Sequence, residues 1–167
     1  MADLFDKEKR SYVMSRVRSA DTKPELVVRS LLHRAGFRFS LRRKDLPGKP
    51  DVVMPKYRTV LFVHGCFWHR HEGCPRSTMP ATRVEFWQEK FARTVERDAA
   101  ATAALTAAGW RVFVIWECEV RADPVMAVQR VIDALEPYRE DLLQTDRRQL
   151  MRDVEARFEA VWRRRGQ

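Results

Sequence analysis

The sequence predicts an α/β fold. Two apolar runs rich in β-branched and aromatic residues, 59–63 and 110–116, have the composition of buried strands. The segment 82–108 between them has the length and composition of a helix. A strand–helix–strand order of this kind predicts a parallel strand pair joined by a crossover helix. With 167 residues, the chain has the size of one domain with its own hydrophobic core.

The N-terminal part predicts an arm, a helix and a strand. A basic, helix-compatible arm covers about residues 6–18. Thr22 and Glu25 form a capping box with proline between them, which predicts a helix start, and Gly36 is a natural C-terminal stop. Phenylalanine and leucine then alternate with polar residues over 37–41, which predicts a half-buried strand.

The central part predicts a hairpin followed by the crossover. Segments 51–54 and 59–63 are apolar and are separated by a short turn, so we expect them to pair in antiparallel fashion. A second capping box, from Thr82 to Glu85, predicts the start of the crossover helix, and Gly109 predicts its end.

The C-terminal part is predicted to be helical. Asp123 and Pro124 predict a helix that runs to about Leu135. The tail over 138–167 mixes arginine and glutamate at helical spacing and adds little beyond charge. The chain contains no internal repeat and no low-complexity linker.

The composition favours a polyanionic partner. The chain has 32 Lys and Arg against 23 Asp and Glu, which gives a net charge of +9. Nucleic acid is the commonest partner of so basic a protein. No apolar run has the length of a membrane-spanning helix, and the charged N-terminus is not a secretory signal. We therefore expect no membrane partner and a cytoplasmic, nucleoid-associated protein of bacterial type.

Four residues are candidate zinc ligands: Cys66, His71, Cys74 and Cys118. An odd number of cysteines argues against a disulfide framework and for metal or thiol chemistry. A Cys₃His set is common in structural zinc sites, and here it would tie the loop after strand 59–63 to the end of strand 110–116. The alternative is that the cysteines pack as small hydrophobic residues. Spacing does not choose between His69 and His71 as the nitrogen ligand, and we favour His71.

Asp51 is a candidate ligand for Mg²⁺. The dipeptide Pro50-Asp51 follows a turn and precedes two strands, which resembles the PD…(D/E)xK arrangement of nucleases. Strand 59–63 offers no second carboxylate, so we expect a backbone carbonyl near Val63, water and phosphate to complete the coordination shell. The alternative role of Asp51 is turn capping.

His69 is the candidate general base, because an imidazole with a pKa of about 6.5 suits the removal of a proton from water. We expect His64 to orient the phosphate or the metal-bound water. Glu25 is a further acidic candidate for this site, but its position as the third residue of a capping box already explains it structurally. His33 is expected to be a surface or packing histidine.

The residues around these candidates resemble one nuclease family. At Asp51, at the motif HGCFWH over 64–69 and at PATRxEFW over 80–87, the sequence resembles the very short patch repair DNA mismatch endonucleases. The resemblance extends over about residues 2–121. Val63 stands where members often have threonine, and Glu72-Gly73 lies in what is often a histidine-rich run.

The resemblance implies a fold and an activity. The fold would be restriction-endonuclease-like, with a mixed central sheet flanked by helices and a structural zinc site. The family cuts one strand 5′ to the thymine of a T:G mismatch, which arises when 5-methylcytosine deaminates. By resemblance, Asp51 and the Val63 carbonyl bind Mg²⁺, His69 is the base, and His64 and Glu25 assist. Zinc falls on Cys66, His71, Cys74 and Cys118, while Phe67, Trp68, Trp87 and Met14 insert into the base stack.

We accordingly expect three segments within one domain: a DNA-contacting arm over 1–20, an endonuclease core over 21–122 and a helical extension over 123–167. The expected partner is double-stranded DNA with a T:G mismatch, bound by a monomer, and mismatch-repair proteins are further candidates. Two other functions compete with this one. A non-catalytic zinc-containing DNA-binding module would need neither Asp51 nor His69, and a restriction-type nuclease would cut both strands of matched DNA.

Overall fold

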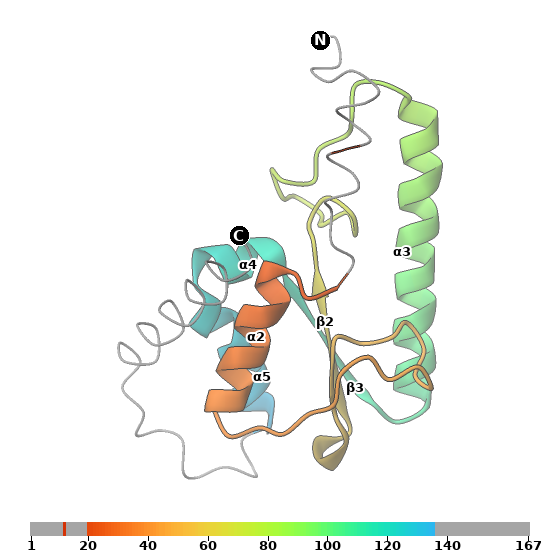
Figure 1. Ribbon diagram of the computed structural model, residues 1–167. Helices are drawn as coiled ribbons and strands as arrows, with labels where there is room; N and C mark the ends of the chain where they lie inside the picture. The colour runs from red at the N-terminus through yellow and green to blue at the C-terminus, as the bar shows by residue number, and fades with distance from the viewer. Residues whose placement is uncertain (1–11, 13–19, 136–167) are drawn as a thin grey trace.

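The computed structural model describes Tyr12 and residues 20–135 (Figure 1). The helices and strands are α2 (Lys23–Arg34), β1 (Val52–Met54), the 3₁₀ turn η1 (Pro55–Tyr57), β2 (Thr59–His64), α3 (Val84–Ala107), β3 (Arg111–Trp116), α4 (Glu117–Ala122) and α5 (Pro124–Leu135). The architecture is mixed α/β, as predicted. No helix in the described part of the chain is long and apolar enough to cross a bilayer.

The sheet has the order β1-β2-β3. β1 pairs with β2 in antiparallel fashion, with Val53 opposite Val60. β2 runs parallel to β3, from Thr59 opposite Arg111 to His64 opposite Trp116. The predicted hairpin and the predicted crossover through α3 are therefore both confirmed.

Helices cover both faces of this small sheet, which explains why its strands are apolar throughout (Figure 1). One face packs Val52 and Leu61 against α2, α4 and α5 in the larger core. The other face packs Val53 and Val60 against Leu105 of α3 in a smaller core. Successive side chains point to opposite faces of a strand, so each run fills both cores.

Several local predictions fail or hold only in part. No strand forms over 37–41; a single antiparallel bridge joins Ser40 to Val53, since Arg42 has a left-handed backbone (φ 54°) and ends the pairing. α3 begins at Val84 with Arg83 as its N-cap residue, so the predicted cap at Thr82 lies one residue outside. Arg83 is itself left-handed (φ 53°), with its guanidinium over the Phe86 ring.

The start of α2 is an altered capping box. Glu25 reaches back as predicted, but its carboxylate accepts from the Asp21 N–H and from the Thr22 hydroxyl. The hydroxyl of Thr22 is therefore a donor to Glu25 instead of an acceptor from the first turn. The short helix α4 follows β3 directly where a plain strand end was expected.

Candidate active site and metal centre

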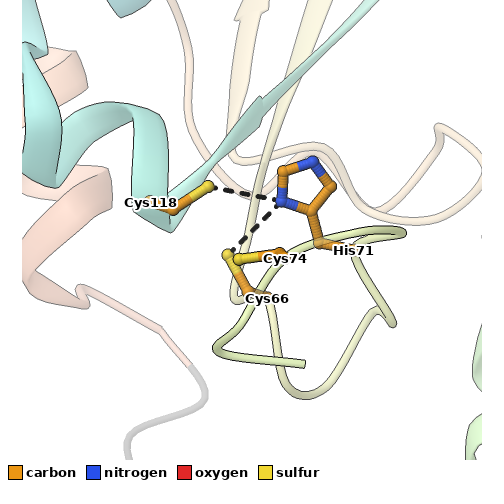
Figure 2. A group of neighbouring side chains, drawn as sticks. All are labelled: Cys66, His71, Cys74 and Cys118. Carbon is orange, nitrogen blue, oxygen red and sulfur yellow. Dashed lines mark hydrogen bonds between the residues drawn. The ribbon is translucent and has the colours of Figure 1, made fainter. Parts of the chain in front are cut away.

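A cluster of three cysteines and one histidine lies where β2 and β3 end (Figure 2). Cys66, His71 and Cys74 come from the loop after β2, and Cys118 comes from the first turn of α4. His71 Nδ1 lies 3.3 Å from the sulfur of Cys118 and 3.7 Å from the sulfur of Cys66. We call these four residues the cysteine cluster. Of the two candidate nitrogen ligands, the structure brings His71 to the sulfurs and places His69 elsewhere.

The donor set of the cysteine cluster fits tetrahedral zinc. All four ligand atoms lie within 4.8 Å of one another, and sulfur–sulfur separations near 4 Å accompany Zn–S bonds of about 2.3 Å. Burial raises the pKa of the Cys66 thiol to about 12. A backbone N–H of Arg76 lowers the pKa of Cys74. A bound cation would favour the thiolate form of all three cysteines, because metal binding replaces the thiol proton.

A second group of polar side chains lines a cleft of about 1060 Å³ between the start of α2, the end of β2 and α3. Five of them form what we call the cleft cluster: Glu25, Asp51, His64, His69 and Asp98. Basic side chains on the walls of the same cleft are Lys23, Lys49, Lys90 and Arg97. The cleft thus combines a compact acidic and imidazole centre with a cationic rim, an arrangement suited to a phosphodiester backbone.

Asp51 is held at the end of β2. Its Oδ2 accepts a hydrogen bond of 2.7 Å from the Val63 N–H. Burial, with a smaller contribution from the nearby Glu25, raises the pKa of this carboxyl to about 6, against the opposing effects of the Val63 N–H and the Arg29 charge. A carboxylate that is desolvated beside another acid and open to a cleft is a favourable ligand for a hard cation.

Glu25 is almost fully buried and belongs to an ion-pair network that the sequence did not reveal. Arg29 donates to Glu25 at 2.7 Å and to Asp21 at 2.6 Å, and Arg42 also pairs with Asp21. The i, i+4 spacing of Glu25 and Arg29 on α2 is the signal that could have identified part of it. The network fixes the Glu25 carboxylate at the wall of the cleft.

The two cleft histidines are stacked, with ring centroids 3.8 Å apart and planes at 8°. Burial and the adjacent His69 lower the pKa of His64 to about 4, so His64 is neutral at neutral pH. His69 Nδ1 lies 2.5 Å from Oδ2 of Asp98, on α3. A carboxylate partner at Nδ1 fixes the orientation of an imidazole and leaves Nε2 free for proton transfer.

Asp98 is the cleft residue that sequence reasoning missed. It follows Arg97 on a charged helix surface, and nothing in the local pattern separates it from other acidic residues of α3. Its partner His69 is 29 positions away in the sequence. Only the packing of α3 against the sheet brings the two together.

The candidate DNA-inserting aromatics gather around Trp68, which lines the cleft. Phe67 meets Trp68 edge-on at 5.0 Å and Trp87 at 5.6 Å, and all three side chains are half-buried. The ammonium of Lys90 lies 5.1 Å from the ring centre of Trp68 and 5.2 Å from that of Trp87. The fourth candidate, Met14, lies outside the described residues.

Comparison with known proteins identifies the family. The family described as DNA mismatch endonuclease Vsr matches residues 2–76. The type II nicking enzyme V.XorIIP of Xanthomonas oryzae is 53% identical over 120 residues, covering 72% of this chain and 88% of that protein. The DNA mismatch endonuclease Vsr of Escherichia coli is 42% identical over 138 residues, covering 83% of this chain and 88% of that protein. With relatives this similar over most of their length, the chain belongs to the Vsr family of DNA mismatch endonucleases.

Proposed function

We propose that this endonuclease nicks one strand of duplex DNA 5′ to the thymine of a T:G mispair and so initiates very short patch repair. The observation that carries the proposal is the cleft cluster: two carboxylates, a carboxylate-held histidine and a neutral histidine share one basic cleft beside half-buried aromatic side chains. A module that only binds DNA would gain nothing from burying Asp51 and Glu25 where a phosphate has to approach.

Each cleft residue has a role that its surroundings support. Asp51 and the Val63 carbonyl are our candidates for holding Mg²⁺, which would supply Lewis-acid charge at the scissile phosphate. His69, held at Nδ1 by Asp98, accepts the proton of the attacking water at Nε2. His64 is neutral at working pH and can accept or donate one hydrogen bond to orient that water or the phosphate.

The acidic residue Glu25 assists from the wall of the cleft, where Arg29 keeps its carboxylate in place. It lies close enough to Asp51 to raise the pKa of that carboxyl. Two neighbouring carboxylates increase the negative potential at a cation site, so we propose that Glu25 strengthens Mg²⁺ binding or positions a water in its shell. The cysteine cluster is our candidate structural zinc site.

The aromatic cluster supports selection of the mismatch. We propose that Phe67, Trp68 and Trp87, with Met14 from the arm, insert beside the mispair. A T:G wobble pair is easier to unstack than a matched pair, and inserting apolar side chains costs a few kcal/mol per step. The difference in unstacking cost then favours binding at the mismatch, while the cleft lysines and Arg97 fix the register on the phosphates.

The same proposal extends to the setting of the protein. We propose a restriction-endonuclease-like fold for the domain, with residues 1–20 as a DNA-contacting arm, 21–122 as the endonuclease core and 123–167 as a helical extension. It would act as a monomer in the bacterial cytoplasm, at the nucleoid, together with mismatch-repair proteins.

The test uses a duplex with one T:G mismatch, end-labelled on either strand, beside its matched T:A twin. Zinc-loaded protein freed of other divalent ions is assayed with and without added Mg²⁺. A single Mg²⁺-dependent cut on the thymine strand, absent from the twin and from Asp51→Asn protein, is the expected result. Cutting of both duplexes would support a restriction-type nuclease, and salt-sensitive binding without any cut would support the binding module.

A further inference from the structure

Trp116 contacts both clusters. It is the last residue of β3 and lies opposite His64 in the parallel strand pair. Its ring stacks on His71 of the cysteine cluster, with centroids 4.1 Å apart and planes at 4°. The same ring meets His64 of the cleft cluster edge-on at 5.4 Å. One side chain therefore lies between a candidate zinc ligand and a candidate active-site histidine.

The ring contacts continue on both sides of Trp116. His64 stacks on His69 at 3.8 Å, and His69 Nδ1 reaches Asp98. On the other side, Nδ1 of His71 faces the sulfurs of Cys66 and Cys118. Ring contacts therefore link His71, Trp116, His64 and His69 in that order. Polar contacts join the first ring to the cysteines and the last ring to Asp98.

We propose that Trp116 is a positioning residue through which zinc bound at the cysteine cluster sets the orientation of His64 and His69. This inference rests on the proposed function, since it gives that orientation a catalytic purpose. A metal bond at Nδ1 fixes the ring plane of His71, and the nearly parallel indole must follow that plane to keep its contact. The edge of the indole then limits how far His64, and the His69 ring stacked on it, can turn.

A second route between the clusters runs through the backbone. The N–H of His69 donates to the Gly65 carbonyl, and the N–H of His71 donates to the Cys66 carbonyl, both at 3.1 Å. Zinc could order this loop without any help from the indole. The experiment has to separate the side-chain route from the backbone route.

Three variants of the full chain make this separation. Trp116→Leu removes the ring but keeps an apolar side chain, and Trp116→Phe keeps a smaller ring. Trp110→Leu is the matched control, because Trp110 packs in the smaller core beside Arg58, away from both clusters. Histidine ring resonances are recorded by NMR at fixed pH for each protein, with and without one equivalent of zinc, and nicking of the T:G duplex is measured in parallel. His33, exposed on α2, is the internal reference.

In wild type and in Trp110→Leu, zinc should shift the resonances of His71, His64 and His69 but leave His33 in place. In Trp116→Leu, zinc should still shift His71, whereas the response of His64 and His69 should largely vanish. The turnover number should fall roughly 10–100-fold, as for other outer-shell partners of metal ligands, with KM little changed. Trp116→Phe should restore part of the zinc response of His64 and His69 and part of the turnover number.

The proposal is overturned if His64 and His69 respond to zinc in Trp116→Leu as they do in wild type, since the backbone route then suffices. Circular dichroism checks the fold, and if Trp116→Leu is unfolded, Trp116→Phe decides by the same resonances. The NMR and circular dichroism measurements need no DNA. A wild-type protein that fails to nick would therefore refute the proposed function while the coupling between the clusters is still measured.

Discussion

The cysteine cluster and the cleft cluster lie side by side, but they are assembled in different ways. Three of the four members of the cysteine cluster come from the short span 66–74. The cleft cluster takes Glu25 from α2, Asp51 from the start of the hairpin and Asp98 from α3. The cysteine cluster is built largely by one loop, whereas the cleft cluster adds three acidic residues from separate elements to two histidines at and just after the end of β2. We therefore expect damage to the first to appear mainly in stability and damage to the second mainly in chemistry.

Cys118→Ser should have the largest effect, because it removes a proposed zinc ligand and with it the proposed tie between the loop and α4. We expect zinc to be lost and the free energy of unfolding to fall by more than about 4 kcal/mol, a loss typical of removing a structural metal. A colorimetric zinc assay and thermal denaturation would measure both. His33→Gln should leave both unchanged. Retention of zinc and of the wild-type Tm in Cys118→Ser would contradict a structural role.

Asp51→Asn should show the opposite pattern. Nicking should drop at least about 10³-fold, since the Lewis-acid contribution at a phosphate is worth several kcal/mol. Zinc content should be unchanged, and the fold should persist. Asp133→Asn, on the exposed surface of α5, is the matched control and should nick normally. Substantial nicking by Asp51→Asn would contradict the proposed role of Asp51 as a metal ligand.

The pH dependence of stability sharpens the same contrast. The pKa of Asp51 is about 6 in the folded protein, against an ordinary value of 3.8 for an aspartate carboxyl. Between these values the folded state holds a proton that the unfolded state has released, so Asp51 makes folding less favourable as pH rises from 4 to 6. The loss reaches at most about 3 kcal/mol, at 1.36 kcal/mol per pKa unit. In urea titrations without Mg²⁺, the unfolding free energy of Asp51→Asn should rise relative to that of wild type as pH increases from 4 to 6. A difference between the two proteins that stays constant over this range would refute the raised pKa of Asp51.

Asp98→Asn should lower the turnover number by roughly 10²-fold, within the range that a positioned general base contributes. The amide would still pack against His69 but would no longer stabilise the imidazolium that the proposed proton transfer forms. His69→Gln should lower turnover at least as much, and the double variant should lose little more, because the two residues act as a unit. Glu89→Gln, exposed on the same helix, serves as the control. Additive losses in single-turnover assays would contradict the pairing.

Trp68→Ala should have the smallest effect, because Trp68 belongs to neither cluster. We expect the preference for T:G over T:A duplex to fall about tenfold, since stacking on one base is worth about 1–3 kcal/mol. Zinc content and Tm should change little. Competition between the two duplexes in one reaction measures the preference directly. A variant that cuts both duplexes more slowly by the same factor would show that Trp68 is not a selectivity residue.

The sequence predicted the sheet well because its strands are buried on both faces. Strands such as 59–63 must then be apolar throughout, and the pattern alone is diagnostic. The cysteine cluster was predictable for a similar reason, since cysteine and histidine are few and fall in one loop. The cap at Thr82 was misplaced by one residue, because left-handed Arg83 takes the N-cap position. Thr22 is the N-cap residue as predicted, but its hydroxyl donates to Glu25 and makes no hydrogen bond to the first turn.

The cleft cluster was only partly predictable. Its histidines stand out by residue type, but Asp98 and Arg29 do not, since acidic and basic residues are common on helix surfaces. Their role depends on contacts across the fold, such as the 2.5 Å approach of Asp98 to His69. The six-residue α4 is too short to give a periodic pattern, so the position of Cys118 in a helix was also missed.

The parallel pairing of β2 and β3 has a consequence for folding kinetics. Residues opposite each other, such as Thr59 and Arg111, are 52 positions apart (111 − 59 = 52), so this pairing closes a long loop and forms slowly. Cys66, His71 and Cys74 lie close enough in the chain to capture zinc before the pairing, whereas Cys118 joins only after β3 has docked. Zinc should therefore bind in two kinetic phases during refolding, the second at the rate of crossover formation.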